Sequence, residues 1–164
     1  ISPLTYSFAA EYKPQFQTNA IMYLETMSLN YGLNSITKSI VGRYRPFSYD
    51  TATVENVLYD YDTRYSFYSG HSSTAFASAV FNIIILTSQS GGLNKTIGVT
   101  LNIVNATAIA TLRVMAGKHF FSDVIVGALV GSGIAYLTTE LHKDALSTNT
   151  NEFEPMRFNF SIPF

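Results

Sequence analysis

The sequence predicts an all-α domain, a compact helical bundle with a long aromatic-rich loop and an extended C-terminal tail. Three stretches are almost purely apolar and of helical length: residues 75–87, 97–112 and 124–137. Only 13% of the 164 residues are charged and 47% are hydrophobic, which indicates heavily buried helices or a membrane-associated domain. Strict alternation of apolar residues occurs only at the C-terminus, at Phe158, Phe160, Ile162 and Phe164.

Helices are expected at about 17–41, from Ser72 or Ser73 to 89, at 94–115 and at 123–142 with Ser122 as N-cap. In the first helix, a helical period places Ala20, Leu24, Met27 and Tyr31 on the inward face and turns Glu25 and Thr26 away. Residues 47–68 lack a clean period and predict a long loop. The small residues Gly127, Ala128, Gly131 and Gly133 predict close helix packing. We therefore expect a helical domain over residues 1–142, followed by a polar linker and extended tail over 143–164.

Composition excludes several classes of function. The net charge of −1 gives no general attraction to nucleic acid, so any anion site must be local. The chain has no cysteine, which excludes disulfides and thiol catalysis. His71, His119 and His142 are its three histidines, and their spacing matches no metal motif, so we expect neither a metal nor another cofactor.

The apolar stretches leave two interpretations of the membrane question. Each falls short of the roughly 18 to 20 unbroken apolar residues of a confident span, and Asn82, Asn102 and Asn105 interrupt two of them. We therefore favour buried core helices in a soluble or peripheral domain over integral membrane helices. The chain starts at Ile1 without a signal-like opening and is interpreted as a fragment or mature form, before which a leader or anchor could have stood.

The first polar cluster, KSIVGRYRP at 38–46, carries three cations. Lys38 and Arg45 are seven residues apart, so a continuous helix would place both on one face, with Arg43 pointing elsewhere. Two cations on one face favour an anion between them. The alternative is a solvated basic helix end before Pro46.

The second cluster, YSGHSS at 68–73, leads into a helix. Ser69 and Gly70 at a helix N-terminus offer backbone N–H groups and the positive end of the helix dipole to a phosphate. His71 can protonate a leaving oxygen, because its pKa lies near neutrality. The alternative is an ordinary cap and turn with an incidental histidine.

The third cluster, LRVMAGKHFFSD at 112–123, places His119 four residues before Asp123. A hydrogen bond to Asp123 would fix the imidazole tautomer and leave the other nitrogen as a nucleophile. Arg113 offers a planar fork for phosphate oxygens, whereas the alternative is an ordinary His–Asp contact at a helix start. The three clusters together indicate a phosphate site, but the residues alone do not decide which histidine attacks.

The three clusters resemble the signature of the type 2 phosphatidic acid phosphatase superfamily, which includes bacterial acid phosphatases and vanadium haloperoxidases. That signature has a lysine, six residues and Arg-Pro, then Pro-Ser-Gly-His, then Ser-Arg, five residues, His, three residues and Asp. The chain matches it in order and spacing at Lys38, Arg45, Pro46, Ser69, Gly70, His71, Arg113, His119 and Asp123. Tyr68 stands for the proline, and Leu112 for a serine that supports the phosphate pocket.

The resemblance implies a helical bundle with the site at one end, and a role for each matched residue. It implies that His119 attacks phosphorus to form a phosphohistidine, that Asp123 orients His119, and that His71 protonates the leaving group and then activates water. The resemblance makes the phosphate-binding set Lys38, Arg45, Ser69, Gly70 and Arg113.

We therefore expect a metal-independent phosphatase that acts on a lipid phosphate, a lipid diphosphate or a small phosphomonoester. The aromatic-rich loop over 57–68 would wall the site or simply pack. The expected location is the periplasmic or non-cytoplasmic face of a bacterial membrane, with contact to the membrane surface and no nucleic-acid partner. The alternatives are a vanadate-dependent haloperoxidase and a phosphate-binding module without turnover, which Tyr68 and Leu112 would favour.

Overall fold

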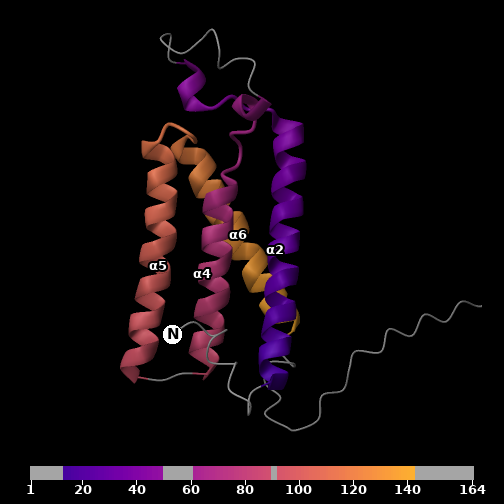
Figure 1. The fold of residues 1–164 in the computed structure, drawn as a ribbon, viewed down its shortest axis with the longest axis vertical. Helices are drawn as coiled ribbons and strands as arrows, with labels where there is room; N and C mark the ends of the chain where they lie inside the picture. Colours follow the sequence, from indigo (N-terminus) through magenta and orange to yellow (C-terminus); the bar gives the residue numbers. More distant parts are fainter. Residues whose placement is uncertain (1–12, 50–60, 90–91, 143–164) are drawn as a thin grey trace, which may run out of the picture.

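The computed structural model describes residues 13–49, 61–89 and 92–142 and confirms the all-α fold. Within these ranges the bundle has four α-helices: α2 (Lys13–Val41), α4 (Gly70–Gln89), α5 (Gly92–Met115) and α6 (Phe121–Leu141). Two short 3-10 helices, η2 (Pro46–Tyr49) and η3 (Tyr61–Arg64), lie at one end of the bundle (Figure 1). No strand occurs in these described ranges. The expected extended C-terminal tail and residues 57–60 of the aromatic-rich loop fall outside them.

Helix α4 is the centre of the bundle. It packs most extensively against α6, which crosses behind it in Figure 1, and also against α5 and α2. Gly127 and Gly131 of α6 lie against the backbone of Ser69 and Ser73, where a Cβ would collide with carbonyl oxygens. The expected close packing is therefore confirmed at these two glycines. It does not extend to Gly133, which has nothing within 4 Å of its Cβ position.

The buried face of α2 is mostly polar. The face predicted from the sequence was wrong for Leu24, Tyr31 and Thr26, whereas Met27 packs against the core as expected. Leu24 and Tyr31 are 64% and 76% exposed, whereas Thr26 is fully buried. The residues that α2 buries are Asn19, Met22, Thr26, Asn30 and Asn34. Two of these side chains make hydrogen bonds to other helices: the hydroxyls of Thr26 and Thr138 lie 2.7 Å apart, and Nδ2 of Asn30 donates to the Thr74 hydroxyl at 3.2 Å. A helix that buries polar groups and exposes apolar ones is typical of membrane bundles, where lipid solvates the outer surface.

Among the described residues, three helices are long and apolar enough to cross a membrane. The segments are Gly70–Ser88, Leu93–Met115 and Phe121–Leu141, and only 33%, 11% and 33% of their most apolar windows are buried inside the bundle. The preference for a soluble or peripheral domain is therefore not supported. That preference came from counting unbroken apolar runs, whereas the helices extend beyond those runs. They also include polar residues that bond to each other, since Nδ2 of Asn82 donates to Oδ1 of Asn102 on α5 at 3.2 Å. These features indicate membrane association.

Candidate active site

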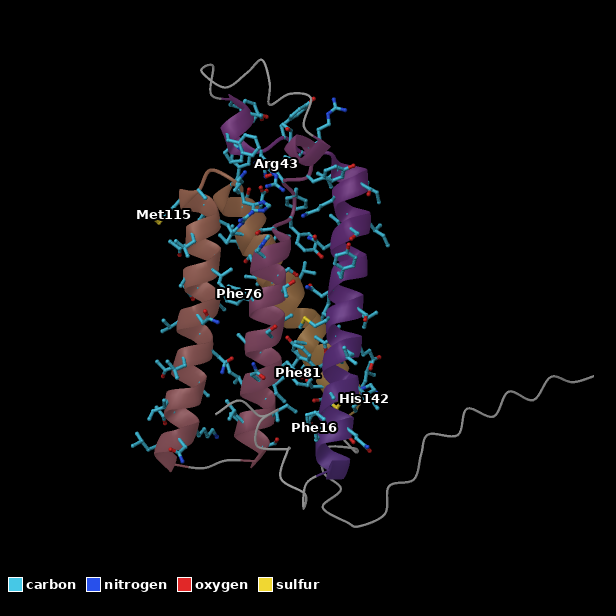
Figure 2. The ribbon with its side chains drawn as sticks, in the orientation of Figure 1. Phe16, Arg43, Phe76, Phe81, Met115 and His142 are labelled. Atoms are coloured by element: carbon cyan, nitrogen blue, oxygen red, sulfur yellow. The ribbon has the colours of Figure 1, made fainter. Side chains whose placement is uncertain are left out.

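All three polar clusters meet at one end of the bundle. Helix α2 and helix α5 end there, and helices α4 and α6 begin there. Arg43 lies at this end among many nitrogen-bearing side chains, whereas His142 lies at the opposite end (Figure 2). There, Nε2 of His142 is 3.6 Å from a carboxylate oxygen of Glu25, so His142 is remote from the site.

The first cluster is split by the end of α2. Helix α2 stops at Val41, and Gly42 follows with a φ of 56°, a conformation that favours glycine. Lys38 is therefore on the helix and Arg45 is beyond it, so the argument from helical spacing was wrong for this pair. A Cβ on Gly70 would nevertheless lie 3.6 Å from Nζ of Lys38, which brings the lysine to the second cluster.

The chain after α2 is tied to two other segments by backbone hydrogen bonds. The N–H of Arg45 donates to the carbonyl of Thr63 at 2.9 Å, and the N–H of Ser66 donates to the carbonyl of Arg43 at 3.0 Å. The N–H of Phe47 donates to the carbonyl of Gly117 at 3.2 Å. Arg45 is thereby held at the site, where only 5% of it is exposed.

The second cluster opens α4 and is anchored on α6. The N–H of Ser69 donates to the carbonyl of Asp123 at 3.0 Å, and the hydroxyl of Ser72 donates to the carbonyl of Val124 at 2.8 Å. Helix α4 starts at Gly70, and the Ser69 hydroxyl accepts from the N–H of Ser72 at 3.3 Å. Ser69 therefore caps this helix, and the assignment of the cap to Ser72 or Ser73 was wrong.

The third cluster opens α6. The N-cap is Phe120, not Ser122 as the sequence suggested, and the Phe120 N–H donates to Oδ2 of Asp123 at 3.0 Å. Gly117 supports the preceding turn with a φ of 65°. Asp123 thus closes the first turn of the helix with its own carboxylate.

His119, in the third cluster, is buried, with 1% exposure. Its Nδ1 lies 2.8 Å from the backbone carbonyl oxygen of Ser66 and 3.8 Å from Oδ2 of Asp123. The shorter contact has hydrogen-bond length and the longer one does not. The expected hydrogen bond from His119 to Asp123 is thus replaced by one to Ser66.

Both carboxylate oxygens of Asp123 are occupied by other donors. Nη1 of Arg43 lies 2.6 Å from Oδ1, and the Ser66 hydroxyl donates to Oδ2 at 2.5 Å. Sequence reasoning missed Arg43 and Ser66. Arg43 was visible in the motif GRYRP but was assigned away from the site, and nothing in the sequence marked Ser66.

Positive charge gathers around His71, which is exposed while His119 is buried. The charges of Arg113, Lys38 and Arg45 act on His71 electrostatically, as does His119. The buried Nε of Arg113 has no hydrogen-bond partner among the described residues. A buried donor left without a partner needs an acceptor, and at a cationic site an anion supplies one.

The two departures from the signature have different surroundings. Tyr68 is 2% exposed, whereas Leu112 is 60% exposed. Burial raises the pKa of the Tyr68 hydroxyl above its ordinary value, so that the phenol stays neutral. The Tyr68 carbonyl accepts from Nδ2 of Asn34 at 3.0 Å, which links the second cluster to α2.

No group of three His, Asp or Glu side chains suited to a metal occurs in the part of the chain that the structure describes.

A family model described as the PAP2 superfamily matches residues 19–147. The match covers more than half of the chain and all three clusters. The chain belongs to the PAP2 superfamily. The family resemblance inferred from the sequence is thus confirmed.

Named relatives of this PAP2 chain come from distant organisms. A protein named phospholipid phosphatase homolog 1.2 homolog, from Caenorhabditis elegans, is 31% identical over 77% of the chain and 44% of its own length. An undecaprenyl-diphosphatase from Sulfolobus acidocaldarius is 32% identical over 66% of the chain and 48% of its own length. The chain therefore spans about half the length of these relatives. No solved structure matches the chain.

Proposed function

We propose that this PAP2 chain hydrolyses a phosphate ester of a lipid through a phosphohistidine, without a metal. The observation that carries the proposal is the convergence of His119, His71 and three cations at one end of the bundle. The unpartnered Nε of Arg113 supports the presence of an anion there. The names of the relatives, a phospholipid phosphatase homolog and an undecaprenyl-diphosphatase, support a lipid phosphate or diphosphate as the substrate.

In the first step Nε2 of neutral His119 attacks phosphorus. The N–P bond forms as the bond from phosphorus to the ester oxygen breaks, and protonated His71 transfers its proton to the departing alkoxide. The charges of Lys38, Arg45 and Arg113 stabilise the phosphoryl oxygens in the transition state, with Ser69 and the Gly70 amide assisting. The products of this step are the free alcohol and phosphohistidine.

In the second step water attacks the phosphohistidine. Neutral His71 takes a proton from the water as its oxygen bonds to phosphorus, and the N–P bond breaks to return the electron pair to His119. Inorganic phosphate leaves and His71 is again protonated. The balance is one ester plus one water to one alcohol plus one phosphate.

We further propose that α4, α5 and α6 span the membrane. Their length, apolar character and low burial support this. A site at one end of such helices would lie near the headgroups, within reach of a lipid phosphate. We propose the non-cytoplasmic side for this end, and the helical domain over residues 1–142 as the catalytic unit.

Trapping the covalent intermediate tests the proposal. Detergent-solubilised protein is mixed with phosphatidic acid labelled with ³²P in the phosphate, quenched in alkali within one turnover and separated from lipid. We expect label on the protein that survives alkali and is lost in acid. The label should be absent in His119→Ala and unchanged in Ser28→Ala, which alters an exposed hydroxyl far along α2.

The other outcomes identify the alternatives. Hydrolysis that persists in His119→Ala without a labelled protein would contradict the mechanism. Tight phosphate binding with no hydrolysis of any lipid phosphate or diphosphate tested would make the chain a binding module. Oxidation of bromide by peroxide that appears only with added vanadate would make it a haloperoxidase.

A further inference from the structure

We infer that Ser66 and Arg43 are positioning residues for the His119 nucleophile, and that Asp123 acts on His119 mainly through them. The inference rests on the proposed function, because it gives His119 the role of nucleophile. It adds two residues outside the PAP2 signature. It also changes the role of Asp123 from direct hydrogen-bond partner of the imidazole to anchor of the group that holds it.

The backbone carbonyl of Ser66 sets the tautomer of His119. A carbonyl oxygen can only accept, so the hydrogen bond of 2.8 Å requires the proton on Nδ1. Neutral His119 then has its lone pair on Nε2, the nitrogen that must attack phosphorus. Asp123 is an ångström farther from Nδ1, at 3.8 Å.

Ser66 can serve as a fixed acceptor because it is held from two further sides. Its N–H donates to the carbonyl of Arg43 at 3.0 Å, and its hydroxyl donates to Oδ2 of Asp123 at 2.5 Å. Ser66 is fully buried. Ser66 therefore contacts the His119 nucleophile with its backbone carbonyl and the Asp123 carboxylate with its side chain.

Arg43 closes the network from the other side. Nη1 of Arg43 donates to Oδ1 of Asp123 at 2.6 Å and to the Ser122 hydroxyl at 2.9 Å. Its guanidinium carbon lies 4.1 Å from the centre of the Phe120 ring. The Arg43 side chain thus contacts three of the four residues after His119, and the Arg43 backbone carbonyl accepts from the N–H of Ser66. Lysine has no planar guanidinium that could stack on the Phe120 ring while it donates to Asp123 and Ser122.

Kinetics of point variants provide the first test. With phosphatidic acid as substrate, Ser66→Ala should lower kcat by about 10- to 100-fold, the range for losing a hydrogen bond to a charged group. KM should change less than about threefold, because the phosphate-binding cations stay in place. Arg43→Met should behave likewise, and Arg43→Lys should recover part of the loss.

Two matched variants control for the loss of a hydroxyl and of an arginine. Ser28→Ala removes a hydroxyl bonded only within α2. Arg64→Met removes an exposed arginine that also lies over an aromatic ring, that of Tyr44, and donates to its hydroxyl. Both should retain wild-type kcat. A Ser66→Ala enzyme with unchanged kcat would overturn the inference.

A double-mutant cycle separates the indirect from the direct role of Asp123. If Asp123 acts through Ser66, the variant carrying both Asp123→Ala and Ser66→Ala should be no slower than Asp123→Ala alone. If Asp123 acts directly on His119, the two losses in kcat should multiply, which would overturn the inference. Should Asp123→Ala fail to fold, Asp123→Asn combined with Arg43→Met gives the same comparison through the charged pair.

The tautomer of His119 gives a readout that does not depend on turnover. Nitrogen-15 spectra of histidine-labelled protein in detergent, assigned with His119→Gln, should show His119 protonated at Nδ1. Ser66→Ala should mix the tautomers. Protonation at Nε2 in the wild type would overturn the inference even in an active phosphatase. Protonation at Nδ1 in a protein without phosphatase activity would refute the proposed function but not the positioning.

Discussion

Gly127 of α6 lies directly against Ser69, the residue that caps α4. A Cβ built on Gly127 would come within 2.6 Å of the Ser69 carbonyl oxygen and 3.3 Å of the Ser73 nitrogen. Backbone atoms cannot yield as a flexible side chain does, so Gly127→Ala must push α4 and α6 apart. We expect a loss of stability of about 1–3 kcal/mol, the usual cost of overpacking. Thermal unfolding in detergent measures it.

The same change should also impair activity, because the displaced backbone carries Ser69 and Gly70. Gly133→Ala is the matched control, since nothing lies within 4 Å of that Cβ position. It should preserve both the unfolding temperature and kcat. Equal behaviour of the two variants would mean that this helix contact does not position the site.

Arg113→Lys tests whether Nε of Arg113 binds the phosphate. The variant keeps the charge but loses the buried Nε that has no hydrogen-bond partner among the described residues. We expect inorganic phosphate to inhibit about tenfold less strongly, since a hydrogen bond to a charged group is lost. The inhibition constant measures this directly. Lys95→Arg, on the same helix but at its other end, should leave that constant unchanged.

His71→Gln should separate the two chemical steps. Without an acid, loss of an alkoxide should slow by about 10²–10⁴-fold. An aryl phosphate, whose leaving group needs little protonation, should phosphorylate the variant much faster than an alkyl phosphate does. The phosphoenzyme should then accumulate, because the water lacks a base. Identical losses for aryl and alkyl substrates would argue against His71 as the acid.

Tyr68 should make stability fall at alkaline pH. Burial raises the pKa of its hydroxyl in the folded state, so above the ordinary pKa of about 10 the unfolded state releases a proton that the folded state keeps. Stability is therefore full below that pH and declines as pH rises through the folded-state pKa. Tyr68→Phe should decline less steeply. Tyr136→Phe, an exposed tyrosine on α6, should follow the wild type.

The sequence predicted the order and extent of the helices because apolar composition and turn residues are local signals. It also predicted which clusters meet, through their resemblance to a family signature. It did not predict the roles of Ser66 and Arg43, which depend on a carbonyl and a guanidinium reaching the α6 start from segments 53 to 80 residues away. Nor did it predict the buried face of α2. A helical period locates an apolar face, but it does not show whether that face packs inward in water or outward against lipid.

Helix α5 provides the test of the membrane proposal. Leu101 is 62% exposed near the middle of α5, and Leu93 is 73% exposed at its start. Lysine at a lipid-facing helix centre costs about 2.5–3.5 kcal/mol on insertion scales, whereas near a helix end it can reach the interface. Leu101→Lys should therefore reduce the fraction of protein that stays in membranes after carbonate extraction, and Leu93→Lys should not. If both variants remain folded and extractable as soluble protein, α5 faces water and the membrane-spanning proposal is wrong.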